Sequence, residues 1–503
     1  TSLQFMASSC LLELISLGPS SLSRSYESKI DWFKSFLSVI KLGVRNSIAH
    51  LLGIICTSEL ESDPARSLSF QELIKELITI SKDQSKQVKA EYHDGSILAL
   101  GYIIGRLTYR YPSTYQSIVP ASLLLEIIEI ISENLDSTKS SSVINASKSL
   151  GEICRYTSFL FENYDKGKGN SDDPSSYNDK LTKIVEKLIT LVKTTKDIKT
   201  QETAITAIGH IALGNSEYTE KVLSLFYDLA STLNKQVDVH FTVGEAITCV
   251  TTGWENLALN QYLDIADASP PSIFIEHSVI NGTLNKMFSE LLPSGKGSVK
   301  KAVCVWMLCL VKFCSKHEVI KTALPKIHSA FSMLLADRDE FTQEVASKGI
   351  GLVYELGDQN TREQLVNSLV DMLSEGKRQK ETINADTQLF DSSTLGQTPD
   401  GSAISTYQSI LSLASDMNQP ELVYKFMQLA SHNAMWQSRK GAAFGFSFII
   451  AQAEKELEPY LKDLIPRLYR FQYDPNPKVN EAMSSIWKAL VKEPKKAIEE
   501  YFA

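Results

Sequence analysis

Residues 204–211 read AITAIGHI, and the pattern in this stretch decides the fold because it returns along the chain. Ala204 is followed five positions later by Gly209, with isoleucine directly before the glycine and again two positions after it. Further copies pair a residue in the small position with a glycine in the same way: Ser96 with Gly101, Ala146 with Gly151, Ala346 with Gly351 and, as a weaker copy, Ile48 with Gly53.

Close packing gives this pattern a physical reason. Residues three, four and seven apart share one face of a helix. Small residues on that face let a second helix approach at the short end of the usual separation of about 8–10 Å. A glycine inside a helix costs about 1 kcal/mol relative to alanine, so its return in five helices indicates a packing demand. Steps of 48, 50 and 58 residues separate the glycines from 53 to 209.

Each of these helices is expected to have a partner upstream of it. The amphipathic stretches that we expect as first helices are residues 30–42, 70–81, 123–135, 181–193, 222–233 and 461–470. An aspartate six to ten residues before the small position is expected near several helix starts, where a carboxylate complements the helix dipole. These are Asp136, Asp197, Asp238, Asp337 and Asp474. Two-helix units of this length predict an all-α fold, an α-solenoid of HEAT or armadillo-like repeats. The alternative is an ordinary helical globule with coincidental glycines.

Residues 1–503 are expected to form one continuous array, and because the first residue is Thr1, we expect a fragment of a longer chain. Hydrophobic residues make up 43% of the chain, enough for a core. Polar loops are predicted at 165–179, 266–281 and 375–402, where helical periodicity is lost. The first is almost free of apolar residues, the second holds a proline pair and ends in an Asn281-Gly282 turn signal, and the third is the longest.

Charge and cysteine usage narrow the function classes. Lys and Arg number 51 against 59 Asp and Glu, a net charge of −8 that argues against nucleic-acid binding. The longest apolar run, residues 302–311, is half the length of a membrane span, so no membrane insertion is expected. Seven cysteines without paired spacing indicate reduced thiols in the cytoplasm or nucleus.

The search for catalytic motifs predicts no enzyme. Gly295-Lys296 resembles the end of a phosphate-binding loop, but position 290 is Glu where that motif needs Gly. Cys304, Cys309 and Cys314 are five apart, so each turns about 140° from the last on a helix and they cannot share a metal. We therefore expect no catalytic residue, no cofactor, no metal site and no small-molecule substrate.

The carboxyl-terminal stretch from residue 394 carries the most specific motifs. They are GQTPDG at 396–401, QPELVYKF at 419–426, WQSRKGAAFGF at 436–446, PRLYRFQY at 466–473 and MSSIWKALV at 483–491. Together they closely resemble the proteasome adaptor and scaffold family, which consists of large proteasome-associated HEAT-repeat proteins. Residues 238–247, DVHFTVGEAI, look like another segment of that family, whereas the first 230 residues match only in helical character.

The resemblance implies a non-enzymatic scaffold that binds the 26S proteasome. Such a scaffold would contact core and regulatory particles, restrain or monitor imperfect assemblies, and reside in cytoplasm and nucleus. Four basic residues are expected to take part in partner binding. Arg439 and Lys440 precede a run of small residues at an expected helix start, where positive charge opposes the helix dipole, so they would meet an acidic partner or a neighbouring repeat's Asp. Arg467 and Arg470 are three apart on one helix face.

Two alternatives stay open on sequence grounds. A karyopherin-like transport carrier also has helical repeats, acidic net charge and cytosolic chemistry, although the carboxyl-terminal motifs argue against it. A scaffolding subunit of an enzyme, such as a phosphatase regulatory subunit, would have shorter and more regular repeats than steps of 48, 50 and 58 residues.

Overall fold

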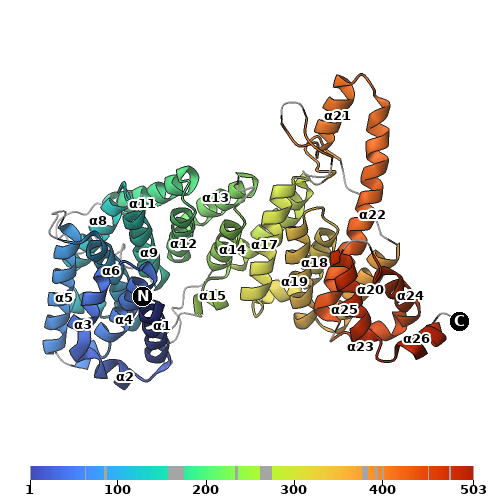
Figure 1. The fold of residues 1–503 in the computed structure, drawn as a ribbon. Coiled ribbons are helices and arrows are strands. Elements are labelled where there is room, and N and C mark those ends of the chain that lie inside the picture. The colour runs from blue at the N-terminus through green and yellow to red at the C-terminus, as the bar shows by residue number, and fades with distance from the viewer. Residues whose placement is uncertain are drawn as a thin grey trace. The chain divides into compact units, whose positions relative to one another are not determined.

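The computed structural model describes residues 2–62, 64–83, 88–156, 175–232, 236–260, 275–375, 383–390, 395–398, 401–450, 452–474 and 477–501. Within these ranges the regular structure is helical, apart from two isolated β-bridges (Figure 1). The predicted all-α class is confirmed. The chain divides into two compact units, the first made of Thr1–Tyr227 and Glu245–Ile275, the second of Asp228–Gly244 and Glu276–Ala503. The single continuous array therefore stays a prediction.

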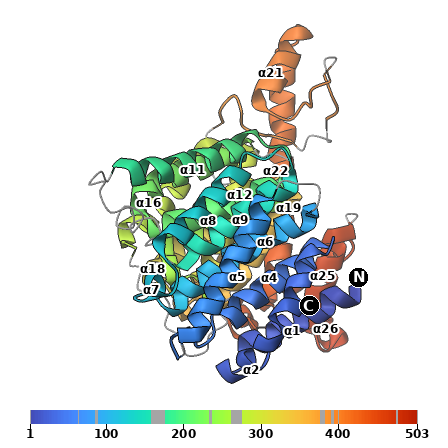
Figure 2. The same ribbon diagram turned by 90° about the vertical axis from the view of Figure 1, so that its left-hand side faces the viewer.

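The first unit is built from paired helices in two layers. Its helices are α1 (Ser2–Leu17), α2 (Ser20–Ser25), α3 (Ile30–Ser35), α4 (Leu42–Cys56), α5 (Pro64–Lys82), α6 (Ala90–Arg110), α7 (Tyr115–Ile118), α8 (Ala121–Asn134), α9 (Ser140–Tyr156), α11 (Ser175–Thr194), α12 (Ile198–Gly214) and α15 (Leu257–Asn260). Helices α13 (Thr219–Thr232) and α14 (Val237–Thr252) each contribute residues to both units. Helices α4, α6, α9 and α12 pack on one another in that order, while α5, α8 and α11 pair with them and follow one another in Figure 2.

The second unit continues with the same kind of helix pair. Its remaining helices are α16 (His277–Lys286), α17 (Gly297–Phe313), α18 (Glu318–Leu335), α19 (Glu340–Leu356), α20 (Gln359–Glu375), α21 (Tyr407–Asp416), α22 (Glu421–Ile449), α23 (Glu454–Leu457), α24 (Leu461–Phe471), α25 (Pro477–Leu490) and α26 (Pro494–Tyr501). Helix α19 packs against α17, α18 and α22, so α17, α19 and α22 form the layer that corresponds to α4, α6 and α9.

The repeated glycines lie where these helices touch. A Cβ atom added at Gly101 would be 2.4 Å from the Ser149 Cα of α9, and one at Gly209 would be 3.1 Å from the Ala246 Cβ of α14. In the second unit, a Cβ atom added at Gly351 of α19 would lie 3.3 Å from the Cβ atom of Phe448 in α22. Five glycine-bearing helices thus meet a neighbouring helix at the glycine itself, which confirms the packing interpretation.

Helix starts agree with the sequence in part. The Asp197 carboxylate accepts a hydrogen bond from the Thr200 N–H at 3.1 Å and caps α12, as expected. Helix α19 is capped by Asp339, and the predicted Asp337 lies just before it, where its carboxylate accepts from the Asp339 N–H at 2.9 Å. Asp136, two residues after the end of α8, caps no helix. Its carboxylate forms an ion pair with Lys187 of α11. Among the predicted first helices, 30–42 is wrong as one helix, because α3 ends at Ser35 and α4 begins at Leu42.

The predicted loop boundaries need correction. Helix α11 begins at Ser175, so the end of the loop predicted at 165–179 is helical, and residues 165–174 lie outside the described residues. Asn281 and Gly282 lie inside α16 and form no turn, while residues 266–274 of that predicted loop are also outside the description. In the third loop, 375–402, the described residues after Glu375 are not helical, as predicted, but they include the buried Leu389 and Phe390.

Candidate partner-binding surface

The second unit carries a projecting element, which we call the arm: the described residues of 383–436, comprising α21, the first half of α22 and the chain before them. In Figure 1 and Figure 2 this element stands clear of the other helices of its unit. A small core of its own holds it together, consisting of Leu389, Phe390, Ile404, Ile410 and Ala430. The described residues of the GQTPDG stretch and the whole QPELVYKF stretch belong to it.

Local sequence explains the shape of the arm. Thr406 begins α21 with a capping box, in which its hydroxyl accepts from the Ser409 N–H while the Ser409 hydroxyl accepts from the Thr406 N–H. The helix ends at Asp416, and Asn418, two residues later, has a φ of 52°. Asparagine tolerates this left-handed conformation better than most residues, so the chain reverses here into α22.

The second half of α22 is fixed in the body of the unit. A Cβ atom at Gly441 would lie 1.8 Å from the carbonyl oxygen of Leu335, so the helices touch backbone to backbone. The Gln343 side-chain amide of α19 donates to the Gln437 carbonyl and side-chain oxygens at 3.3 and 3.2 Å. A single helix of 29 residues therefore joins a tightly packed base to a projecting end.

Arg439 and Lys440 lie in the interior of α22, which begins at Glu421, so the expected helix start at this pair is wrong. Lys440 is 7% exposed, and its ammonium lies 5.5 Å from the Trp436 ring and 5.6 Å from the Phe444 ring. The Arg439 guanidinium lies 5.9 Å from the Phe471 ring of α24. Neither cation forms an ion pair within the described residues, so the intramolecular aspartate considered from sequence is not their partner there.

The other two predicted binding residues separate from each other. Arg467 donates a hydrogen bond to the Ser374 hydroxyl near the end of α20, so it joins α24 to α20. Arg470, three residues later, is exposed. The structure thus brings Arg439 next to α24 through Phe471 but gives the four residues no common site.

Sequence reasoning missed a line of residues along α22. Lys425, Leu429, Trp436 and Lys440 follow one another at steps of 4, 7 and 4 residues, which keeps them within an arc of about 60° at 100° per residue. We call this line the lysine–tryptophan face. Leu429 is 47% and Trp436 36% exposed, and Lys425 is exposed. The spacing was visible in the sequence, but a helix start placed near 439 hid it.

Among the described residues, no three histidine, cysteine, aspartate or glutamate side chains lie close enough together to hold a metal ion. Burial raises the pKa of the Cys56 thiol to about 12 and raises the pKa of Cys304 well above its usual value, so both thiols stay protonated and unreactive. No helix in the described ranges has the length and apolar character needed to cross a membrane.

Comparison with known proteins gives relatives over nearly the whole chain. The family model described as ECM29, ARM-like repeats, matches residues 2–153. The human proteasome adapter and scaffold protein ECM29 is 37% identical over 508 residues, which cover 98% of this chain and 26% of that protein. The chain belongs to the ECM29 family. It spans about a quarter of the length of the curated ECM29 relatives that it matches.

The Drosophila melanogaster ECM29 homolog, a proteasome-associated protein, is 29% identical over 98% of this chain and 26% of its own length. Among solved structures, a chain from the structure of Kap95p binding to RanGDP is 12% identical and covers 99% of this chain and 68% of that one. Its TM-score of 0.34 is too low to carry an argument about function. Membership of the ECM29 family and the helical repeats agree with the resemblance seen in the carboxyl-terminal motifs.

Proposed function

We propose that this chain is a non-enzymatic scaffold segment that binds the 26S proteasome, tethers core and regulatory particles, and restrains or monitors imperfect assemblies. The observation that carries the proposal is 37% identity, over 98% of the chain, to a human protein named as a proteasome adapter and scaffold. Stacked helix pairs suit this role, because repeat arrays offer long surfaces to large partners. The proposal places the protein in cytoplasm and nucleus.

Sedimentation tests the binding part. The purified chain is run on a glycerol gradient with intact 26S proteasome, with free core particle and with free regulatory particle. We expect the chain to move with the intact particle and with at least one of its parts. A chain that stays at the top of all three gradients would contradict binding by this segment.

The monitoring role needs a separate measurement. Binding to intact 26S proteasome is compared with binding to particles purified from a strain that lacks one assembly factor. The proposal predicts tighter binding to the incomplete particles, and equal affinity would remove the monitoring role while leaving the scaffold role in place. No observation in the structure favours the karyopherin-like alternative.

A further inference from the structure

Helix α1 carries a row of apolar side chains that the described structure leaves exposed. The row consists of Leu3, Met6, Cys10, Leu14 and Leu17. Steps of 3, 4, 4 and 3 residues keep these side chains within an arc of about 80° at 100° per residue. The leucines and the methionine are between 57% and 76% exposed, and the cysteine is exposed too. We call this row the leucine face. It has no charged member.

The leucine face lies on the side of α1 that points away from α4. Ser8 and Ile15 are buried, and Phe5 contacts α4, where a Cβ atom added at Gly43 would stand 2.6 Å from its ring. At 100° per residue, the mean direction of these three side chains differs from that of the leucine face by about 170°. Helix α1 therefore has two apolar sides, and α4 covers one of them.

The place of α1 in its layer gives a reason for two apolar sides. Helix α4 packs between α1 and α6, and α6 packs between α4 and α9. Figure 2 shows α1 at one end of this row. A helix inside the row meets a neighbour on each side. In α6, Tyr102 lies where Gly53 of α4 approaches, and Gly101 lies against Ser149 of α9. The leucine face would be buried in the same way by one further helix.

The chemistry of the leucine face is that of a surface between repeats. A repeat that ends an array has a polar outer face, because that face meets water. The leucine face instead runs for about 21 Å along α1 without a charge. Its steps of three and four residues are those of a helix that packs lengthwise on another helix. An uncharged face selects neither an acidic nor a basic partner.

The length of the relatives indicates where the covering helix comes from. This chain covers 26% of the human and 26% of the Drosophila melanogaster ECM29 protein, so most of that length lies outside it. In a repeat array, each helix pair buries its apolar side on the next pair of the same chain.

We propose that the leucine face of α1 is the surface on which a further helix pair of the same protein packs, one that lies outside these 503 residues. The covering helix lies about 8–10 Å from α1 and places apolar side chains between those of the leucine face. The inference goes beyond the proposed function, because it assigns an interface within the protein and depends on no proteasome contact.

Cys10 gives a direct measurement, because it lies in the middle of the leucine face and the other six cysteines are buried. Alkylation of Cys10 by iodoacetamide is followed by mass spectrometry in the 503-residue chain and in the full-length protein. The rate should be lower by about tenfold or more in the full-length protein, with that protein monomeric by light scattering. Thr79→Cys, at an exposed position of α5, is the reference and should react at the same rate in both proteins.

Leu14→Glu distinguishes a buried interface from an open surface. In the full-length protein its carboxylate would be buried without a partner, so the variant should raise Cys10 alkylation by about tenfold or more. In the 503-residue chain Leu14 is 57% exposed, and the rate should stay within about threefold. The matched control is Leu68→Glu, at a 64% exposed leucine of α5, which should leave Cys10 protected in the full-length protein. Circular dichroism melting checks that each variant folds.

Three results would overturn the proposal. Equal alkylation of Cys10 in the two proteins would leave the leucine face open to a different protein. Protection that Leu14→Glu does not relieve would place the covering contact elsewhere. Protection that appears only in a dimer would assign the face to a second copy. Proteasome binding is measured separately, so a full-length protein that co-sediments with 26S proteasome while Cys10 stays reactive keeps the proposed function and loses this interface.

Discussion

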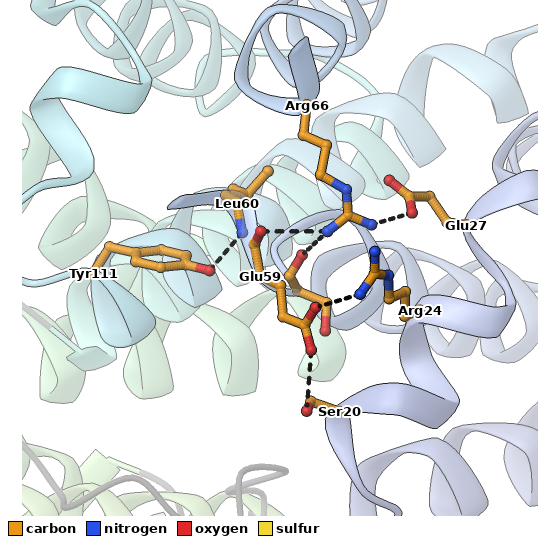
Figure 3. A network of polar contacts seen from close by, with 8 residues as sticks. Ser20, Arg24, Glu27, Glu59, Leu60, Arg66 and Tyr111 are labelled. Atoms are coloured by element: carbon orange, nitrogen blue, oxygen red, sulfur yellow. Dashed lines mark hydrogen bonds and ion pairs between the residues drawn. The ribbon is translucent and has the colours of Figure 1, made fainter. Parts of the chain in front are cut away.

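At the scale of single residues, the connection between α4 and α5 shows how side chains hold an unfavourable backbone. Glu59 has a φ of 52°, a left-handed conformation that costs most residues about 1 kcal/mol or more. Figure 3 shows its carboxylate beside Arg24 and Ser20, and its carbonyl oxygen beside Arg66. Tyr111, directly after α6, closes the network from the other side.

The Tyr111 hydroxyl is expected to stabilise the first unit. It accepts from the buried Leu60 N–H at 2.8 Å and donates to the Thr57 carbonyl at 3.0 Å. Tyr111→Phe leaves that N–H without its partner, which should lower the free energy of unfolding by about 1–3 kcal/mol in urea titrations. Tyr424→Phe removes a hydroxyl from a side chain that is 77% exposed and serves as the control. Equal effects of the two substitutions would contradict this role.

His210 predicts a dependence of stability on pH. Its Nδ1 lies 3.0 Å from the Gly151 carbonyl oxygen, and burial, helped by the charge of Arg155, lowers the pKa of the imidazole to about 4. Glu152 opposes this shift only in part. The unfolded chain takes up the proton near pH 6.5, so the folded state loses stability as the pH falls from about 6.5 towards 4.

The measurement compares wild type with His210→Gln, which cannot take up the proton. Urea unfolding at pH 7.5, 6, 5 and 4 should show a loss in wild type that exceeds the loss in the variant by about 1–3 kcal/mol at pH 4. Burial also lowers the pKa of His50 well below its usual value, so some acid sensitivity should remain in the variant. Parallel stability curves would show that His210 does not contribute.

At the scale of elements, α22 should depend on the absence of a side chain at one position. A Cβ atom at Gly441 would meet the Leu335 carbonyl oxygen at 1.8 Å, so Gly441→Ala must push α22 away from the end of α18. We expect a loss of about 1–3 kcal/mol in the stability of the second unit, measured by thermal or urea unfolding.

Gly282→Ala is the matched control in the same unit. Gly282 also lies inside a helix, α16, and has no atom within 4 Å of the place where its Cβ would stand. Alanine is the better helix former by about 1 kcal/mol, so this variant should be unchanged or more stable. A loss of stability in Gly282→Ala as large as in Gly441→Ala would contradict the packing interpretation.

These elements also show how far the sequence could be interpreted. The glycine five positions after a small residue predicted helix contacts correctly, because two helices can approach closely where the residues between them are small. Pro420 and the left-handed turn at Asn418 lie directly before α22. The apolar residues that follow are spread around the helix and do not form one stripe, so no amphipathic pattern marked its start. The small core around Phe390 was also missed, since it joins Leu389 to Ala430 over a distance in sequence that no local pattern reveals.

The candidate binding residues were harder to predict than the helices. Arg439 and Lys440 were expected to meet an acidic partner or a neighbouring repeat's Asp, and their aromatic neighbours Phe471 and Phe444 could be assigned only with the helices in place. Arg467 was expected to bind a partner together with Arg470, yet it bonds to Ser374 on another helix. Side-chain partners far apart in the sequence decide which cations remain open to another protein.

At the scale of the whole molecule, two units of stacked helix pairs carry the proposed scaffold function. The chain represents about a quarter of its ECM29 relatives, so its own affinity for the proteasome is the quantity that decides the account. Stacked repeats suit a protein that acts by binding, because they offer long surfaces to large partners.

The most direct measurement is equilibrium binding of the fluorescently labelled chain to purified 26S proteasome, by co-sedimentation over a range of proteasome concentrations. The account predicts saturable binding that excess unlabelled chain competes away and that Gly282→Ala leaves unchanged. Binding that never saturates, or that unlabelled chain does not reduce, would contradict the claim that this segment of the ECM29 family is itself a proteasome-binding scaffold.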